Sequence, residues 1–148
     1  MSAGEPHIAT VVIDRPADVV FAFMADGEQL SRWSFGTWET DIAPDGLITG
    51  TSLFDGSVIY VRIDPDRDRL TIDYRLGREP VNLVPRIAAR VSAGPDMGLE
   101  DGQSVLSLMA WRAAGMDDHR WRKLKASHEL EILLIKDLIE NENKGRAQ

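Results

Sequence analysis

The sequence predicts an α+β fold in which a curved antiparallel sheet of about seven strands wraps around one long C-terminal helix. Two observations carry this prediction. Apolar and polar residues alternate with a period of two through the middle of the chain, and apolar residues recur with helical spacing between about Asp117 and Asn141. A helix with a wide apolar stripe needs an apolar surface to cover, so we expect the sheet and the last helix to enclose one core.

The N-terminal segment predicts one strand and then two short helices. Residues His7 to Asp14 are rich in β-branched side chains, which favour a strand. Pro16 is suited to the first turn of a helix, and the carboxylate of Asp18 complements the positive end of the helix dipole. A second short helix, Glu28 to Trp33, follows the corner at Gly27.

From Thr37 onward the pattern predicts about six strands, separated by turns that are rich in Gly, Pro and Asp. Pro85 lacks the N–H group that a central strand donates, so its strand is predicted to be an edge strand or to contain a bulge. The predicted strands are Thr37 to Ile42, Leu47 to Phe54, Ser57 to Ile63, Arg69 to Leu76, Leu83 to Ser92 and Gln103 to Ala113.

Length and composition limit the class of protein. The 148 residues suffice for one domain, with ends at residues 1–6 and 142–148 that we expect to be flexible. A formal net charge of −7 argues against a nucleic-acid partner, because phosphate contacts need clustered Lys and Arg.

The absence of cysteine excludes disulfides and thiolate chemistry. No apolar run approaches the ~20 residues that span a bilayer, and no signal-peptide pattern is seen, so we expect a cytoplasmic protein without membrane insertion. The oligomeric state stays open.

Several segments together resemble the START/Bet v 1-like (SRPBCC) helix-grip superfamily, in particular its polyketide cyclase/dehydrase and lipid-transport-like branch. They are the opening block IATVVIDRPADVVFAFMADGEQLSRW, the segment GLITGTSLFDG, the strand series and the long last helix. The resemblance covers nearly the whole chain and implies a helix-grip fold with a deep apolar cavity for lipids, sterols, polyketides or other hydrophobic metabolites. Some members catalyse cyclisation, dehydration or aromatisation, and others carry or sense a ligand. Because function lies in the site, the resemblance does not choose among these activities.

Three polar residues, Ser127, His128 and Glu131, interrupt the apolar stripe of the last helix. His128 and Glu131 are three residues apart, so their side chains share one helix face. An imidazole can act as acid or base while a carboxylate orients it, which makes His128 and Glu131 candidate catalytic residues and all three candidate ligand contacts. The alternative, and the commoner arrangement, is that they are satisfied polar groups that bridge the helix to the sheet or to water.

Large side chains are candidates for the wall of the cavity, with plain core packing as the alternative. On the last strand both faces are plausible inside. The face that carries Met109 and Trp111 is favoured, because the opposite face would place Arg112 in the interior. The candidate wall residues are Phe23, Trp33, Tyr74, Met109 and Trp111.

Arg86 and Arg90 alternate with apolar residues and are predicted to lie on a solvated outer face. If they pointed inward instead, an acidic group on the ligand would be expected. No cofactor and no metal site is predicted, because His128 and Glu131 alone supply too few ligands for zinc. The sequence also contains neither a glycine-rich phosphate loop nor a nucleophile elbow.

These observations predict binding or carriage of a hydrophobic small molecule, such as a lipid, a polyketide or an aromatic metabolite, in an internal cavity. One alternative is a polyketide cyclase/dehydratase-like enzyme that uses His128 as acid or base. A second alternative is a protein-interaction module. The last interpretation predicts an exposed apolar patch and no sizeable internal cavity.

Overall fold

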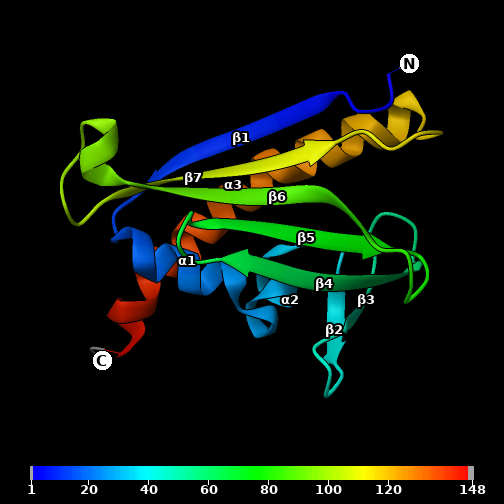
Figure 1. Ribbon diagram of the computed structural model, residues 1–148, viewed down its shortest axis with the longest axis horizontal. Coiled ribbons are helices and arrows are strands. Elements are labelled where there is room, and N and C mark those ends of the chain that lie inside the picture. Colours follow the sequence, from blue (N-terminus) through cyan, green and yellow to red (C-terminus); the bar gives the residue numbers. More distant parts are fainter. Residues whose placement is uncertain (1, 147–148) are drawn as a thin grey trace.

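The computed structural model of the chain describes residues 2–146, with side chains as far as residue 142. Within these residues the chain forms the predicted architecture: seven strands in one antiparallel sheet, two short helices after the first strand and a long C-terminal helix (Figure 1). The predicted flexible ends, 1–6 and 142–148, include residues 1, 147 and 148, which lie outside the described part. Pro6 already belongs to the first strand, and the last helix continues to Arg146.

The strands are ordered β1-β7-β6-β5-β4-β3-β2 across the sheet, so β1 and β2 lie at its edges. Every neighbouring pair is antiparallel. The strand boundaries lie within about three residues of the predicted ones, and the largest differences are that β3 ends at Thr51 and that β4 continues through Pro65 to Asp66. Pro65 is tolerated there since β3 pairs with β4 only as far as Val61. The strands are β1 (Pro6–Ile13), β2 (Trp38–Ile42), β3 (Ile48–Thr51), β4 (Val58–Asp66), β5 (Thr71–Gly77), β6 (Val84–Ala93) and β7 (Ser104–Trp111).

The helices all pack on the same side of the curved sheet. Helix α1 (Ala17–Ala25) contacts β4 to β7, and α3 (Asp118–Arg146) contacts β1 and the short helix α2 (Leu30–Trp33). Figure 1 shows α3, coloured orange to red, running along the sheet behind β6 and β7. The core between these layers is formed by side chains of α1, the inner sheet face and the C-terminal half of α3, among them Phe21, Ile72, Leu106, Leu108, Ile132 and Ile135.

The inner face of β7 is the opposite of the predicted one. Met109 and Trp111 are half-buried on the outer face, so their prediction as cavity wall is wrong. The prediction assumed that Arg112, just beyond the strand, would be an unpaired charge if it lay in the interior. In the structure Arg112 lies inside and its charge is paired. Its guanidinium donates hydrogen bonds to the Met116 carbonyl at 2.7 and 3.1 Å and to Asp118 Oδ1 at 2.8 Å. The buried residues of this face are Ser104, Leu106, Leu108, Ala110 and Arg112.

A bulge at the start of β6 changes the direction of Arg86. Tyr74 pairs with Ile87, but Leu76 pairs with Val84, so β6 has one residue more than β5 in this interval. The extra residue is the bulge that Pro85 predicted, and it lies before the first β6–β7 pair at Ile87. Regular alternation would place Arg86 outside, yet Arg86 and Ile87 both face the interior cavity described below.

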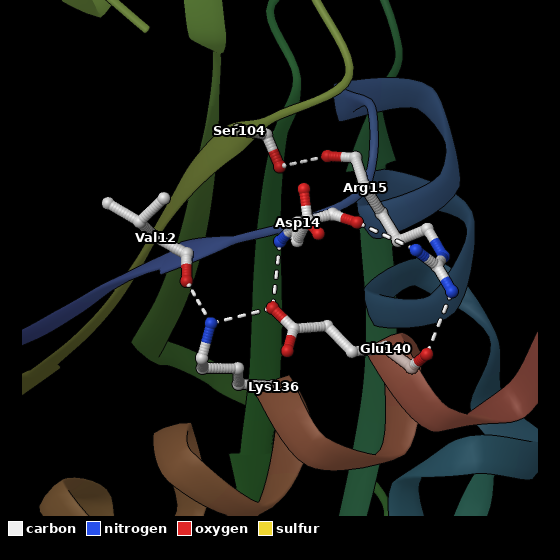
Figure 2. A network of polar contacts seen from close by, with 6 residues as sticks. All are labelled: Val12, Asp14, Arg15, Ser104, Lys136 and Glu140. Carbon is white, nitrogen blue, oxygen red and sulfur yellow. Dashed lines mark hydrogen bonds and ion pairs between the residues drawn. The ribbon is translucent and has the colours of Figure 1, made fainter. Parts of the chain in front are cut away.

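Polar contacts fasten the C-terminal half of α3 to the end of β1 (Figure 2). Glu140 Oε2 accepts hydrogen bonds from the backbone N–H of Asp14 at 2.8 Å and from Lys136 Nζ at 2.6 Å. Lys136 also donates to the carbonyl of Val12 at 2.7 Å, and Arg15 donates to the carbonyl of Glu140 at 2.8 Å. The turn between β1 and α1 is thereby joined to the closing helix.

We predict that Glu140→Ala lowers the free energy of unfolding by about 1 to 3 kcal/mol, because it leaves the Asp14 N–H and Lys136 without their carboxylate acceptor. The matched control is Asp137→Ala, which removes an exposed carboxylate from the same helix and should change stability by less than about 0.5 kcal/mol. Urea unfolding followed by circular dichroism measures both values. Equal effects of the two substitutions would contradict the fastening role.

Candidate functional site

A cavity of about 430 Å³ lies between the N-terminal half of α3 and the sheet. Its wall is formed by β4, β5 and β6, by the loop after α2, by the β3–β4 turn and by the segment from Ala113 to Asp117 that leads into α3. Gly115 in that segment has φ +81°, a conformation that other residues rarely adopt, and so permits the turn. The volume is within the range of small-molecule sites in proteins.

A smaller apolar pocket of about 70 Å³ adjoins this cavity on the side of α2, and we call it the extension of the cavity. Both parts are bordered by Ile59, Leu76 and Ile87 from the sheet and by His128 and Glu131 from α3. Trp33 and Tyr74 line the extension, and we call it the aromatic end. Their rings are 5.9 Å apart at an angle of 74°, and the Tyr74 hydroxyl donates to the Met24 carbonyl at 2.6 Å. The hydroxyl of Tyr74 in the aromatic end is therefore already hydrogen-bonded within the protein.

Ser127, His128 and Glu131 all face the interior, with exposed fractions of 8%, 4% and 3%. Ser127 Oγ donates a hydrogen bond to the carbonyl of Leu124 at 2.8 Å, so its hydroxyl hydrogen is used within α3. Since His128 and Glu131 border both parts of the cavity, they lie at its middle rather than at a polar end.

Glu131 joins α3 to the loop after α2. Its Oε2 accepts a hydrogen bond from the backbone N–H of Phe35 at 2.9 Å, whereas Oε1 is buried without a hydrogen-bond partner. Oε1 lies 3.8 Å from His128 Nε2, which is beyond hydrogen-bond distance. A small polar group of a ligand between these two atoms would satisfy both.

His128 is accompanied by a second histidine from β1. The rings of His7 and His128 are 6.5 Å apart in an edge arrangement. His7 Nε2 lies 3.0 Å from Glu129 Oε1, close enough for an ion pair but without the alignment of a hydrogen bond. Within the described residues, buried side-chain polar atoms without a hydrogen-bond partner belong to His7, Arg120, His128 and Glu131, all in or beside the cavity. Such atoms are uncommon in native interiors, and their clustering marks this region as a candidate site.

Burial sets the charge of the two central groups. It lowers the pKa of His128 to about 4, with a further contribution from the nearby His7. Burial raises the pKa of Glu131 to about 8, although the hydrogen bond from the Phe35 N–H and the nearby Ser127 hydroxyl act in the opposite direction. At pH 7 the imidazole is therefore neutral and the carboxyl group mostly protonated, so the pair offers a proton acceptor beside a proton donor.

The structure brings together five of the predicted site residues and separates three from them. Trp33, Tyr74, Ser127, His128 and Glu131 line the cavity or its extension. Phe23 is buried in the core instead, and Met109 and Trp111 lie on the outer sheet face. Whether the five contact a ligand stays a prediction.

The cavity residues that were not predicted as site residues include two arginines, Arg86 and Arg120. Arg86 was predicted to lie outside; the bulge at Pro85 was the available signal for its inward direction. Arg120 lies within the predicted helix and shares a face with Leu124, Ser127 and Glu131 at spacings of four, seven and eleven residues, so this spacing was the available signal. Arg90 lies on the exposed face, as predicted.

Metal ligands do not gather in the described part of the chain: no group of three or more His, Asp or Glu side chains is arranged to hold an ion. Among the helices of residues 2–146, none has the length and apolar character needed to cross a membrane.

A sheet that curves around a long closing helix, with a cavity between them, is the START/Bet v 1-like helix-grip fold. Among solved structures, the chain is similar to the Zhui aromatase/cyclase from Streptomyces sp. R1128, with a TM-score of 0.66, 20% identity and coverage of 97% of this chain and 96% of that chain. It is also similar to a START superfamily protein from Mycobacterium smegmatis, with a TM-score of 0.62, 13% identity and coverage of 93% and 99%. At these identities the similarity establishes the fold alone. No family model and no curated protein matches the sequence.

We predict that Glu131→Gln stabilises the protein increasingly as the pH rises from about 4.5 to 8. The raised pKa of Glu131 means that the native carboxyl group contributes fully below its unfolded pKa, and that this contribution is lost as the pH rises through the native pKa. An amide does not ionise, so the difference from the wild type should reach the order of 4 kcal/mol at pH 8 and be small near pH 4.5. Urea unfolding across this pH range measures it, with Asp137→Asn as the exposed control. A pH-independent difference would show that burial does not shift this group.

Proposed function

We propose that this protein binds and carries a hydrophobic small molecule, a lipid, a polyketide or an aromatic metabolite, in the cavity under α3. The observation that carries the proposal is the cavity of about 430 Å³, which extends into an apolar end walled by Trp33 and Tyr74. An apolar body in that end would exchange water contacts for aromatic and aliphatic ones. His128 and Glu131 would contact a polar group of the ligand near the middle of the cavity.

A specific observation favours a second candidate function, acid–base catalysis on a polyketide-type substrate. Burial pushes the pKa values of His128 and Glu131 in opposite directions, which leaves a neutral base beside a protonated acid at neutral pH. One structure with the same fold is described as an aromatase/cyclase, which supports this candidate by analogy. Carriage ranks first because the cavity alone explains it, whereas catalysis also requires a reacting atom between the two groups.

The interaction-module alternative has less support. It predicts an exposed apolar patch in place of a ligand pocket, whereas the pocket of about 430 Å³ under α3 supports ligand binding. The cytoplasmic location, the absence of nucleic acid as a partner and the single-domain organisation of residues 1–148 are retained as parts of the proposal.

We predict saturable 1:1 binding of the neutral fluorescent probe N-phenyl-1-naphthylamine, measured by the rise in its emission. Leu76 and Ile59 border both parts of the cavity, so Leu76→Trp and Ile59→Phe should each weaken binding by about tenfold or more by filling the space. Ile8→Trp, on the exposed outer face of β1, is the matched control and should leave binding unchanged. Circular dichroism melting shows whether each variant folds. No saturable binding by the wild type, or binding unchanged in both filled variants, would refute the proposal.

Native mass spectrometry of protein purified from its own host identifies any retained compound, and His128→Gln then separates carriage from catalysis. For a carrier we expect the compound to be recovered unchanged after incubation, and its affinity to change less than about fivefold in His128→Gln, because one contact is altered. If a new product forms instead, and its rate of formation falls about 100-fold or more in His128→Gln while binding is retained, the protein is an enzyme.

A further inference from the structure

Two arginine side chains in the cavity wall, Arg86 and Arg120, form no salt bridge with an acidic side chain of the described residues. Among residues 2–146, Arg86 makes no hydrogen bond or ion pair. Arg120 has its guanidinium carbon 4.2 Å from the centroid of the Phe54 ring, and its Nη1 is buried without a hydrogen-bond acceptor. We call this region, defined by Arg86 and Arg120, the arginine end of the cavity. Leaving a buried charged donor unpaired is costly, so such a group calls for an acceptor.

The acidic groups close to Arg120 are occupied elsewhere. Asp55 accepts hydrogen bonds from the N–H and hydroxyl of Ser57 and pairs with Arg78 at 3.1 Å. Asp117 Oδ1 accepts the backbone N–H of Arg120 at 2.7 Å and so caps the first turn of α3. Both carboxylates act favourably on the Arg120 guanidinium through space, but neither forms a salt bridge with it. Glu131, the buried carboxyl group of the cavity, is mostly protonated at pH 7.

Arg86 and Arg120 also act on each other unfavourably. Burial, and then the proximity of Arg120, lower the pKa of Arg86 from its usual range. A guanidinium nevertheless stays protonated in proteins. The cavity wall of a chain whose net charge is −7 therefore carries two arginines without a salt bridge, beside Arg78, which pairs with Asp55. A bound anion would relieve the repulsion and supply the missing acceptor.

We propose that the arginine end binds the oxyanion headgroup, a carboxylate or a phosphate monoester, of an amphipathic ligand. The hydrophobic body of the ligand passes His128 and Glu131 and ends between Trp33 and Tyr74. This inference rests on the proposed function, since it requires that the cavity hold a hydrophobic molecule. Guanidinium groups suit it because their planar N–H donors match the oxygens of carboxylates and phosphates.

The helix sets the scale of the ligand. The residues from Arg120 to Glu131 span three turns of α3, about 16 Å at 1.5 Å per residue. A ligand that joins the two ends is therefore elongated, with its acidic group separated from the aromatic end by the length of the cavity. A compact anion such as free phosphate would occupy the arginine end and leave the apolar part unused.

The test compares probes that share one hydrocarbon chain. Decanoate, decyl phosphate and decan-1-ol are titrated at pH 7.5 by displacement of N-phenyl-1-naphthylamine or by calorimetry. A merely apolar cavity would bind decanol more tightly, because an ionised headgroup resists leaving water. We expect at least one anionic probe to bind about tenfold or more tightly than decanol. Preference for decyl phosphate would assign a phosphate headgroup, and preference for decanoate a carboxylic acid.

The variants locate the headgroup. Arg86→Gln and Arg120→Gln should each weaken binding of the preferred anion by about tenfold and leave decanol within twofold, and Arg120→Lys should restore part of the loss. Arg90→Gln, on the exposed face of the same strand, and Arg122→Gln, exposed on the same helix, remove equal charge and should change neither probe. These controls separate a local contact from an effect of net charge.

The outcomes distinguish this inference from the proposed function. If decanol and the neutral fluorescent probe bind but neither anion binds more tightly than decanol, the oxyanion site is refuted and the cavity proposal stands. An equal loss of decanol and anion affinity in Arg86→Gln and Arg120→Gln would likewise refute it. If no probe binds, both proposals fail.

Discussion

The position of α3 over an open sheet is the constraint on which the remaining features depend. The sheet ends at β1 and β2 and does not close on itself, so the interior is enclosed only where the helices cover it. Polar contacts hold α3 at both ends: Arg112 binds the segment that enters the helix, and Glu140 joins its last turns to the chain after β1 (Figure 2). The middle of the helix is therefore held in place without having to fill all the space beneath it.

Burial then decides which charges remain in that space. His128 and Glu131 respond by changing their protonation, because an imidazole and a carboxyl group both have an accessible neutral form. Arginine has no such form near neutral pH. One helix face thus combines groups that become neutral inside the protein with a guanidinium that stays charged, and the distribution of charge along the cavity follows from residue type and depth.

The overall fold was predictable because it depends on periodicity, which the sequence displays directly. The alternation of β-branched and polar residues identified the strands, and the interrupted stripe identified the helix face that carries Ser127, His128 and Glu131. The inner face of β7 was not predictable, since the partners that make Arg112 acceptable inside come from the Met116 carbonyl and Asp118 in the following segment. Arg86 was missed because Pro85 indicated either an edge strand or a bulge, and only the pairing of β6 with β5 shows that a bulge turns Arg86 inward.

Because of the bulge before Ile87, the side of the sheet to which Arg86 points depends on the number of residues in β6. Deleting one residue between Val84 and Arg86 would restore regular alternation with β5, and the remaining positions would exchange their inner and outer faces up to the start of the strand. The charge of the cavity wall therefore depends on the number of residues in this part of β6 as well as on which side chains they carry. In a homologous chain that keeps the arginine but lacks one residue before it, the arginine would point to solvent. Insertions and deletions before Arg86 are therefore as informative about the class of ligand as the identity of Arg86 itself.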